Sequence, residues 1–190
     1  GGPGPDLIYL PERPFEEEAY LRDVERLLQK KKGIVVVASE GLKDRSGRPI
    51  VEPIFTASRA TYFGDVGAHL ANLVIKRLGY KARSEKPGLI GRASILLQSS
   101  IDREEAIEAG RRATQAVLAG ETGKMVAFRR RSDSPYRAEP FLVEISQVMM
   151  TERVVPDAYI NAEGNGVTEV FKDWCRPLLG EELPEMISFN

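Results

Sequence analysis

Residues 7–38 begin with Leu7-Ile8-Tyr9-Leu10 and end with Ile34-Val35-Val36-Val37-Ala38, and both apolar runs predict buried strands. Between them, Phe15 to Lys31 repeats apolar residues with a helical period. Glutamates at its start and lysines at its end suit the helix dipole. A strand, a helix and a second strand make a βαβ unit with parallel strands, and its crossover is expected to be right-handed.

The chain beyond residue 38 continues this alternation after a long irregular connection over 39–64. The elements expected next are a helix capped by Asp65 and stopped by Gly79, a strand at Tyr80–Ser84, a helix with Asp102 and Glu105 at capping-box spacing, and strands at Met125–Phe128 and Phe141–Ile145. The pattern predicts an α/β fold with a mainly parallel sheet flanked by helices. In such a sheet the ligand crevice lies beyond the carboxyl ends of the strands.

Length and composition restrict the kind of protein. The chain has 190 residues, which favours a single domain over 1–190, and its net charge of −1 gives no footprint for nucleic acid or an acidic membrane. No apolar run approaches the roughly 20 residues that span a bilayer. Cys175 is the only cysteine, so no intrachain disulfide forms. We therefore expect a cytoplasmic protein.

The first residues indicate a piece of a longer protein. They read Gly1-Gly2-Pro3-Gly4-Pro5, with no initiator methionine, and lead directly into the first apolar run. Such a start is typical of a linker or of a cut inside a longer chain. We expect a fragment.

Carboxylates follow both strands of the βαβ unit, on the side where the crevice is expected. Glu12 comes after the first strand between Pro11 and Pro14, which hold the backbone extended. It is suited to accept hydrogen bonds from sugar hydroxyls; the alternative is an exposed charge paired with Arg13. Glu40 follows the second strand and is interpreted as a lining residue, with a purely structural role as the alternative.

Two arginines are candidates for binding phosphate. Arg83 lies in the predicted strand after the second helix, and Arg92 lies beyond the Pro87-Gly88 turn. The guanidinium group donates two parallel charge-assisted hydrogen bonds, which suits a phosphate group. The alternative for each is a solvated arginine or a surface ion pair.

Three other features are interpreted as structural. His69 has no second histidine or cysteine with which to bind a metal and is expected to pack between elements. Arg129-Arg130-Arg131 is expected to run from the end of a strand into a solvated loop. The segment from Gly120 to Lys124 is not a phosphate loop, because Met125 stands where serine or threonine is required.

Several segments, taken in order, resemble the phosphofructokinase family. They cover residues 5 to about 179 and look most like the bacterial group that contains pyrophosphate-dependent enzymes. The segments are Pro5 to Phe15, which includes Pro11-Glu12-Arg13-Pro14, Val35 to Gly41 with its Ser-Glu-Gly ending, Leu78 to Arg83, Gly91-Arg92, Gly120 to Val126, and Val155 to Asn161.

The resemblance implies a C-terminal, sugar-phosphate-binding part of a two-domain enzyme. Glu12 would hydrogen-bond the sugar of fructose 6-phosphate, Arg83 and Arg92 would hold its phosphate, and Tyr80 would belong to the same element. In this family one such arginine reaches the active site of a neighbouring subunit, so the resemblance also implies a homo-oligomer. Leu89 stands where many members have a histidine ligand, and Gly91 replaces a glutamine.

The family's Gly-Gly-Asp-Gly and Thr-x-Asp motifs do not occur in residues 1–190. Phosphoryl transfer requires a donor cradle, magnesium ligands and a group that orients the hydroxyl. The resemblance implies Mg²⁺ in the intact enzyme, with no ligand for it and no catalytic residue in this chain. We therefore expect a parent enzyme that converts fructose 6-phosphate to fructose 1,6-bisphosphate with pyrophosphate or ATP, and a chain that is inactive alone.

Two other interpretations remain open. One is a non-catalytic sugar-phosphate-binding or regulatory α/β module, and the other is a plain α/β interaction domain. The interaction domain explains the periodicity but not the ordered set of segments.

Overall fold

The computed structural model describes residues 4–57, 60–95, 98–149 and 151–181, and these residues divide into two units. The first contains residues up to Gly88 together with Ile160–Val167. The second contains Leu89–Tyr159 and the residues from Thr168 onward. The prediction of one domain over 1–190, as part of a longer enzyme, stays a prediction.

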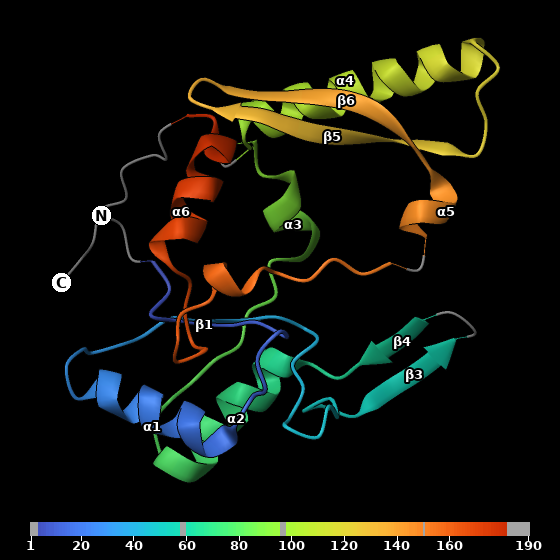
Figure 1. Cartoon of the computed structure of the whole chain (residues 1–190). Coiled ribbons are helices and arrows are strands. Elements are labelled where there is room, and N and C mark those ends of the chain that lie inside the picture. Colours follow the sequence, from blue (N-terminus) through green and yellow to red (C-terminus); the bar gives the residue numbers. More distant parts are fainter. Residues whose placement is uncertain (1–3, 58–59, 96–97, 150, 182–190) are drawn as a thin grey trace. The chain divides into compact units, whose positions relative to one another are not determined.

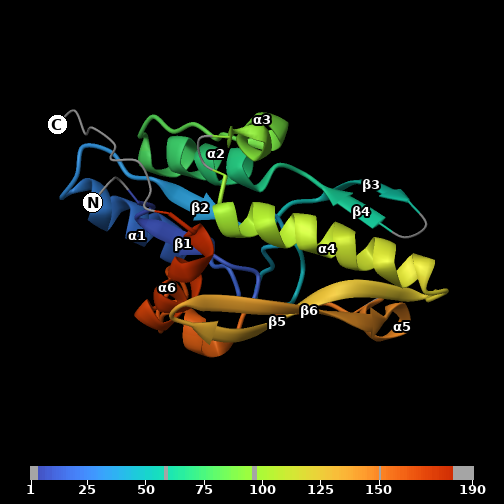
Figure 2. The same ribbon diagram turned by 90° about the horizontal axis from the view of Figure 1, so that it is seen from above.

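The first unit contains the predicted βαβ unit. Strand β1 (Leu7–Tyr9) pairs in parallel with β2 (Val36–Ala38), and helix α1 (Glu17–Leu28) connects them. The register places Leu7 opposite Val36 and Tyr9 opposite Ala38. Figure 1 shows α1 on the same side of the strands as α2 (Val66–Leu78), and Figure 2 shows β2 beside β1.

Helix α2 begins and ends as the sequence predicts. The Asp65 carboxylate accepts a hydrogen bond of 2.8 Å from the Ala68 N–H, which satisfies one of the unpaired donors of the first turn. Hydrogen bonding to that N–H lowers the pKa of Asp65. Gly79 ends the helix with φ of 73°, a conformation that glycine adopts without strain.

The buried core lies largely in the first unit. Its members come from β1, α1, α2 and the connection after β2: Leu7, Tyr9, Phe15, Tyr20, Leu21, Val24, Leu42, Val66, Leu70 and Val74. Burial raises the pKa of Tyr20 to about 12, so this core tyrosine is neutral at physiological pH. The apolar face of α1 and α2 therefore fixes the position of the first strand.

The second unit consists of helices and a long hairpin. Helix α4 (Ser100–Leu118) runs along β5 (Lys124–Asp133) and β6 (Tyr136–Glu144), as Figures 1 and 2 both show. Its other elements are α3 (Gly88–Ala93), which begins at the boundary between the units, α5 (Ile145–Val148), the 3₁₀ turns Asp157–Tyr159 and Arg176–Leu179, and α6 (Glu169–Cys175).

The prediction of a mainly parallel sheet is wrong. The described strands form three two-stranded sheets, of which only β1–β2 is parallel. Part of the expected connection 39–64 is instead the antiparallel pair β3 (Pro53–Ala57) and β4 (Ala60–Phe63). In this pair and in β5–β6 one strand follows the other after a short connection, which antiparallel strands allow and parallel strands do not. The fold is mixed α/β.

Three local predictions are also wrong. Tyr80–Ser84 is not a strand, because it forms no ladder with any described segment. Ser99, not Asp102, caps α4 by accepting a hydrogen bond from the Asp102 N–H. Arg129–Arg131 lies inside β5 rather than in a loop, since pairing with β6 continues to Asp133.

Candidate functional site

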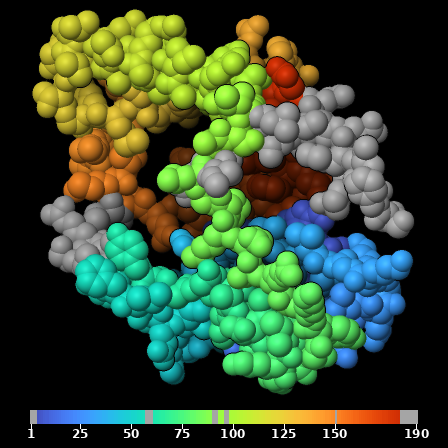
Figure 3. Space-filling model, turned by 180° about the vertical axis from the view of Figure 1, so that it is seen from behind, coloured from blue at the N-terminus to red at the C-terminus, as the bar shows by residue number. Residues whose placement is uncertain are grey.

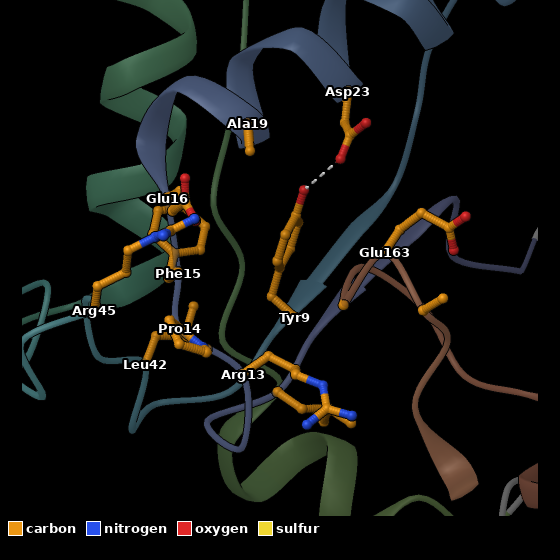
Figure 4. Close-up of a pocket in the computed structure, with 13 residues that line it drawn as sticks. Tyr9, Arg13, Pro14, Phe15, Glu16, Ala19, Asp23, Leu42, Arg45 and Glu163 are labelled. Carbon is orange, nitrogen blue, oxygen red and sulfur yellow. Dashed lines mark hydrogen bonds and ion pairs between the residues drawn. The ribbon is translucent and has the colours of Figure 1, made fainter. Parts of the chain in front are cut away.

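A cavity of about 480 Å³ opens at the carboxyl end of β1, within the first unit. This volume is within the range of small-molecule sites. Its lining, most of which is labelled in Figure 4, comes from β1 and the following turn, the start of α1, the connection after β2 and residues 162–164: Tyr9, Leu10, Arg13, Pro14, Phe15, Glu16, Ala19, Asp23, Leu42, Arg45, Ala162, Glu163 and Gly164.

Aromatic rings form a rigid part of this lining. The rings of Tyr9 and Phe15 meet edge to face with centroids 5.3 Å apart, and Tyr20 lies 5.6 Å from each of them behind the lining. Such edge-to-face contacts add to the stabilisation from burial. The ring of Tyr9 therefore has a defined position at the cavity.

The Asp23 carboxylate accepts hydrogen bonds from three side chains at one side of the cavity. The Tyr9 hydroxyl donates to Asp23 Oδ2 at 3.3 Å, and Asn165 Nδ2 donates to the same oxygen at 2.6 Å. Arg26 Nη2 donates to Asp23 Oδ1 at 2.7 Å. Burial, reinforced by the Asp23 charge, raises the pKa of Tyr9. Tyr9 thus remains a neutral hydroxyl that donates to the carboxylate (Figure 4).

The segment 160–167 forms an internal turn and is hydrogen-bonded to β1. Asn161 Oδ1 accepts hydrogen bonds from the backbone N–H groups of Asn165 and Gly166, both at 3.0 Å. The Ile8 N–H then donates to the Asn165 carbonyl at 2.9 Å. Asn165, which Gly166 follows in a pair typical of turns, is therefore a buried connection between β1 and α1.

Gly164 brings this segment against Arg13. Its φ is 73°, and a Cβ built there would lie 3.4 Å from Arg13 Cγ. A larger residue would have both an unfavourable backbone conformation and a close neighbour. The contact supports the stem of Arg13, whose side chain lines the cavity (Figure 4).

Two of the charged residues that line the cavity, Arg45 and Glu16, form an ion pair. Arg45 Nε donates to Glu16 Oε1 at 2.6 Å, although the Arg45 side chain is 77% exposed. An exposed pair of this kind contributes little to stability. It does hold the connection after β2 next to the start of α1.

Glu12 lies in the turn at the end of β1, next to the cavity. The Arg13 N–H donates to the Leu10 carbonyl at 3.2 Å, which closes the turn, and the residues on both sides of the Pro11-Glu12 step line the cavity. Glu12 itself is half-buried. Its position after β1 agrees with the location that the sequence predicts for the crevice.

Tyr80 and Arg83 are on the segment that follows α2, and both side chains are exposed, that of Tyr80 to 43%. This segment returns along α2: Ala82 packs against the core, the Ser84 Cβ lies 3.2 Å from a Cβ built at Gly67, and Lys86 Nζ lies 3.6 Å from Asp65 Oδ2. Figure 3 shows α2 and this segment at the surface of the first unit. Neither Tyr80 nor Arg83 lines the cavity.

Arg92 belongs to α3, in the second unit. The cavity, by contrast, is lined by residues of the first unit alone. The assignment of Glu12, Tyr80, Arg83 and Arg92 to one ligand stays a prediction.

The remaining candidates have structural surroundings. His69 is partly buried, with Nε2 3.4 Å from Glu17 Oε1, as expected of a packing histidine between helices. Arg130 lies over the rings of Tyr136 and Trp174 and donates to the Trp174 carbonyl at 2.7 Å, so it connects β5 to α6. Glu40 is exposed.

Two kinds of feature are absent from the described part of the chain. Its residues contain no group of three or more His, Cys, Asp or Glu side chains placed to hold a metal ion. No described helix combines the length and hydrophobicity needed to cross a membrane.

Known proteins resemble this chain over nearly its whole length. The pyrophosphate–fructose 6-phosphate 1-phosphotransferase of Rhodospirillum rubrum is 33% identical over 192 residues, which is 96% of this chain and 47% of that protein. The protein of the same name from Methylococcus capsulatus is 33% identical over 183 residues, which is 94% of this chain and 43% of that protein. The chain thus spans less than half the length of these relatives.

A solved structure shows the same similarity in three dimensions. The pyrophosphate-dependent phosphofructokinase of Marinobacter aquaeolei superposes with a TM-score of 0.74 at 30% identity, covering 96% of this chain and 43% of that one. No family model matches the sequence.

Proposed function

Because this chain belongs to the phosphofructokinase family, we propose that it supplies the fructose 6-phosphate-binding part of a sugar-phosphate phosphotransferase. The intact enzyme would transfer phosphate to the 1-hydroxyl of fructose 6-phosphate and form fructose 1,6-bisphosphate. The names of the relatives favour pyrophosphate as donor, with ATP as the alternative.

The position of Glu12 carries this proposal. It lies half-buried in a turn at the carboxyl end of a parallel strand, between residues that line a cavity of about 480 Å³. A carboxylate there is suited to accept hydrogen bonds from sugar hydroxyls, since an ionised carboxylate has only acceptors. Arg83 and Arg92 would supply charge-assisted bonds to the phosphate, and Tyr80 would belong to the same element.

The reaction itself is assigned to residues outside this chain. The described residues do not include a carboxylate set that fits Mg²⁺, so we derive no step through that ion. We propose that the chain alone binds substrate without catalysis. An assay of the chain with fructose 6-phosphate, pyrophosphate and Mg²⁺ is expected to give no fructose 1,6-bisphosphate, and turnover would contradict this assignment.

A thermal-shift titration with fructose 6-phosphate tests the binding proposal. A ligand that binds only the folded chain stabilises it by about 2.7 kcal/mol at a hundredfold excess over Kd, which raises Tm. Arg83→Ala and Arg92→Ala are expected to abolish the shift, because each removes a phosphate contact. Lys81→Ala removes an exposed cation from the same segment as Arg83 and serves as the matched control.

Equal shifts in the wild-type chain and in both arginine variants would contradict the assignment of those residues. An absence of any shift would mean that the sugar-phosphate site needs residues outside this chain, and it would contradict the proposal that the chain alone binds substrate.

A further inference from the structure

Asn165 and Gly166 form the only Asn-Gly pair in the sequence. Asparagine is a thermolabile residue, because the backbone nitrogen of the next residue can attack its side-chain amide. Glycine in that next position hinders the attack least, since it has no Cβ. A side chain at 166 would crowd Asn161, because a Cβ built there would lie 3.1 Å from Asn161 Nδ2. The packing of the segment 160–167 therefore favours a pair that is prone to this attack.

Every polar group of the buried Asn165 is hydrogen-bonded. Its backbone N–H donates to Asn161 Oδ1 at 3.0 Å, and its carbonyl accepts from the Ile8 N–H at 2.9 Å. In its side chain, Oδ1 accepts from Asn161 Nδ2 at 2.9 Å, and Nδ2 donates to Asp23 Oδ2 at 2.6 Å. The side-chain amide is thus held from both ends, and the loss of its nitrogen would break the bond to Asp23.

The attacking nitrogen is held as well. The Gly166 N–H donates to Asn161 Oδ1 at 3.0 Å, and the Gly166 carbonyl accepts from the Asn161 N–H at 3.0 Å. The attack requires this nitrogen to lose its proton, and the hydrogen bond stabilises the protonated form. Ring closure would therefore break the bonds to Asn161 and to Asp23 together.

We propose that Asn165 is a latent deamidation site, which the folded first unit protects and which opening of the segment 160–167 exposes. In the opened chain the Gly166 nitrogen bonds to Asn165 Cγ. The Cγ–Nδ2 bond breaks, and ammonia leaves with the proton of the Gly166 N–H. Water then opens the cyclic imide at either of its carbonyl groups, which gives aspartate or isoaspartate at position 165. The site needs no reactant other than water.

The product does not fit the contacts that Asn165 makes. It carries a carboxylate in place of the amide that donates to Asp23, and two carboxylates in contact repel each other. Isoaspartate also adds a carbon atom to the backbone, which displaces the hydrogen bonds between Asn161 and Gly166. Glu163 and Gly164 belong to the same turn and line the cavity, so the modification alters the cavity too. Deamidation is thus a covalent record that the segment has opened.

Incubation of the full chain at neutral pH, in buffer and in urea, tests the proposal. Peptide mapping by mass spectrometry measures the exchange of NH₂ for OH at each asparagine. Asn165 is expected to react about tenfold or more slowly in buffer, because only the opened fraction of the chain reacts. In urea it is expected to react faster than Asn72, which Leu73 follows. Equal rates at Asn165 in buffer and in urea would overturn the proposal, as would no faster reaction than Asn72 in urea.

Two variants test which contacts protect Asn165. Asp23→Ala and Asn161→Ala each remove hydrogen bonds that hold the pair, and each is expected to speed deamidation in buffer about tenfold. Glu25→Ala truncates an exposed acidic residue on α1 and is the matched control, with the wild-type rate expected. Val74→Ala lowers stability through the core without touching the segment 160–167.

An acceleration in Val74→Ala as large as in the two contact variants would overturn the assignment of protection to these contacts, and so would wild-type rates in both contact variants. Circular dichroism checks that each variant is folded, and the comparison of buffer with urea for the wild-type chain does not depend on any variant. Because no sugar phosphate is present, these outcomes leave the binding proposal unaffected.

Discussion

Asp23 and Asn165 join parts of the chain that are far apart in the sequence. Their hydrogen bond of 2.6 Å spans 142 positions. The sequence does not predict a role for either residue. Asp23 is one of several polar residues in a predicted helix, and Asn165 with Gly166 is a pair typical of turns. Glu12, by contrast, is predictable, since its place directly after an apolar run needs only local pattern and the general rule for parallel strands.

Asn165→Ala is expected to destabilise the chain by about 1–3 kcal/mol, because it leaves the half-buried Asp23 carboxylate without its closest donor. Urea unfolding followed by circular dichroism measures the effect. The control is Gln115→Ala, which truncates an exposed side chain on α4. Equal stability of both variants would show that the hydrogen bond makes no net contribution.

Elements whose limits are set by neighbouring residues are predicted correctly from the sequence. Elements that need a partner far away in the chain are not. The limits of α2 follow from Asp65 and Gly79, both of which act within one helical turn. Tyr80–Ser84 has strand-like residues but no partner strand among the described segments, and strand formation requires one. The sequence predicts a loop for the arginines of β5, because the aromatic partners of Arg130, Tyr136 and Trp174, lie on other elements.

Asp65→Ala is expected to lower the free energy of unfolding by about 1 kcal/mol, because the first turn of α2 loses its side-chain acceptor. Asp65→Asn keeps an oxygen acceptor and is expected to retain most of that stability. Thermal unfolding of the two variants makes the comparison. If both lost the same stability, the Asp65 charge and its contact with Lys86, rather than the cap, would account for the effect.

At the scale of the molecule, the cluster of buried core residues and the cavity belong to the same unit. The parallel pair β1–β2 and its two helices are the part that the sequence predicts well, because a βαβ unit is a local structure. The strands predicted at Met125–Phe128 and Phe141–Ile145 form parts of β5 and β6, but the sequence does not predict their antiparallel pairing or the pair β3–β4. The resemblance to phosphofructokinases rests on segments whose order along the chain is visible in the amino-acid sequence alone.

Calorimetric titration of this chain with fructose 6-phosphate, and separately with fructose, tests the central claim most directly. The account predicts saturable binding of fructose 6-phosphate and much weaker binding of fructose, because the phosphate supplies the charge-assisted hydrogen bonds. Equal affinity for the two sugars, or no heat from either, would contradict the claim that this chain forms the sugar-phosphate-binding part of the enzyme.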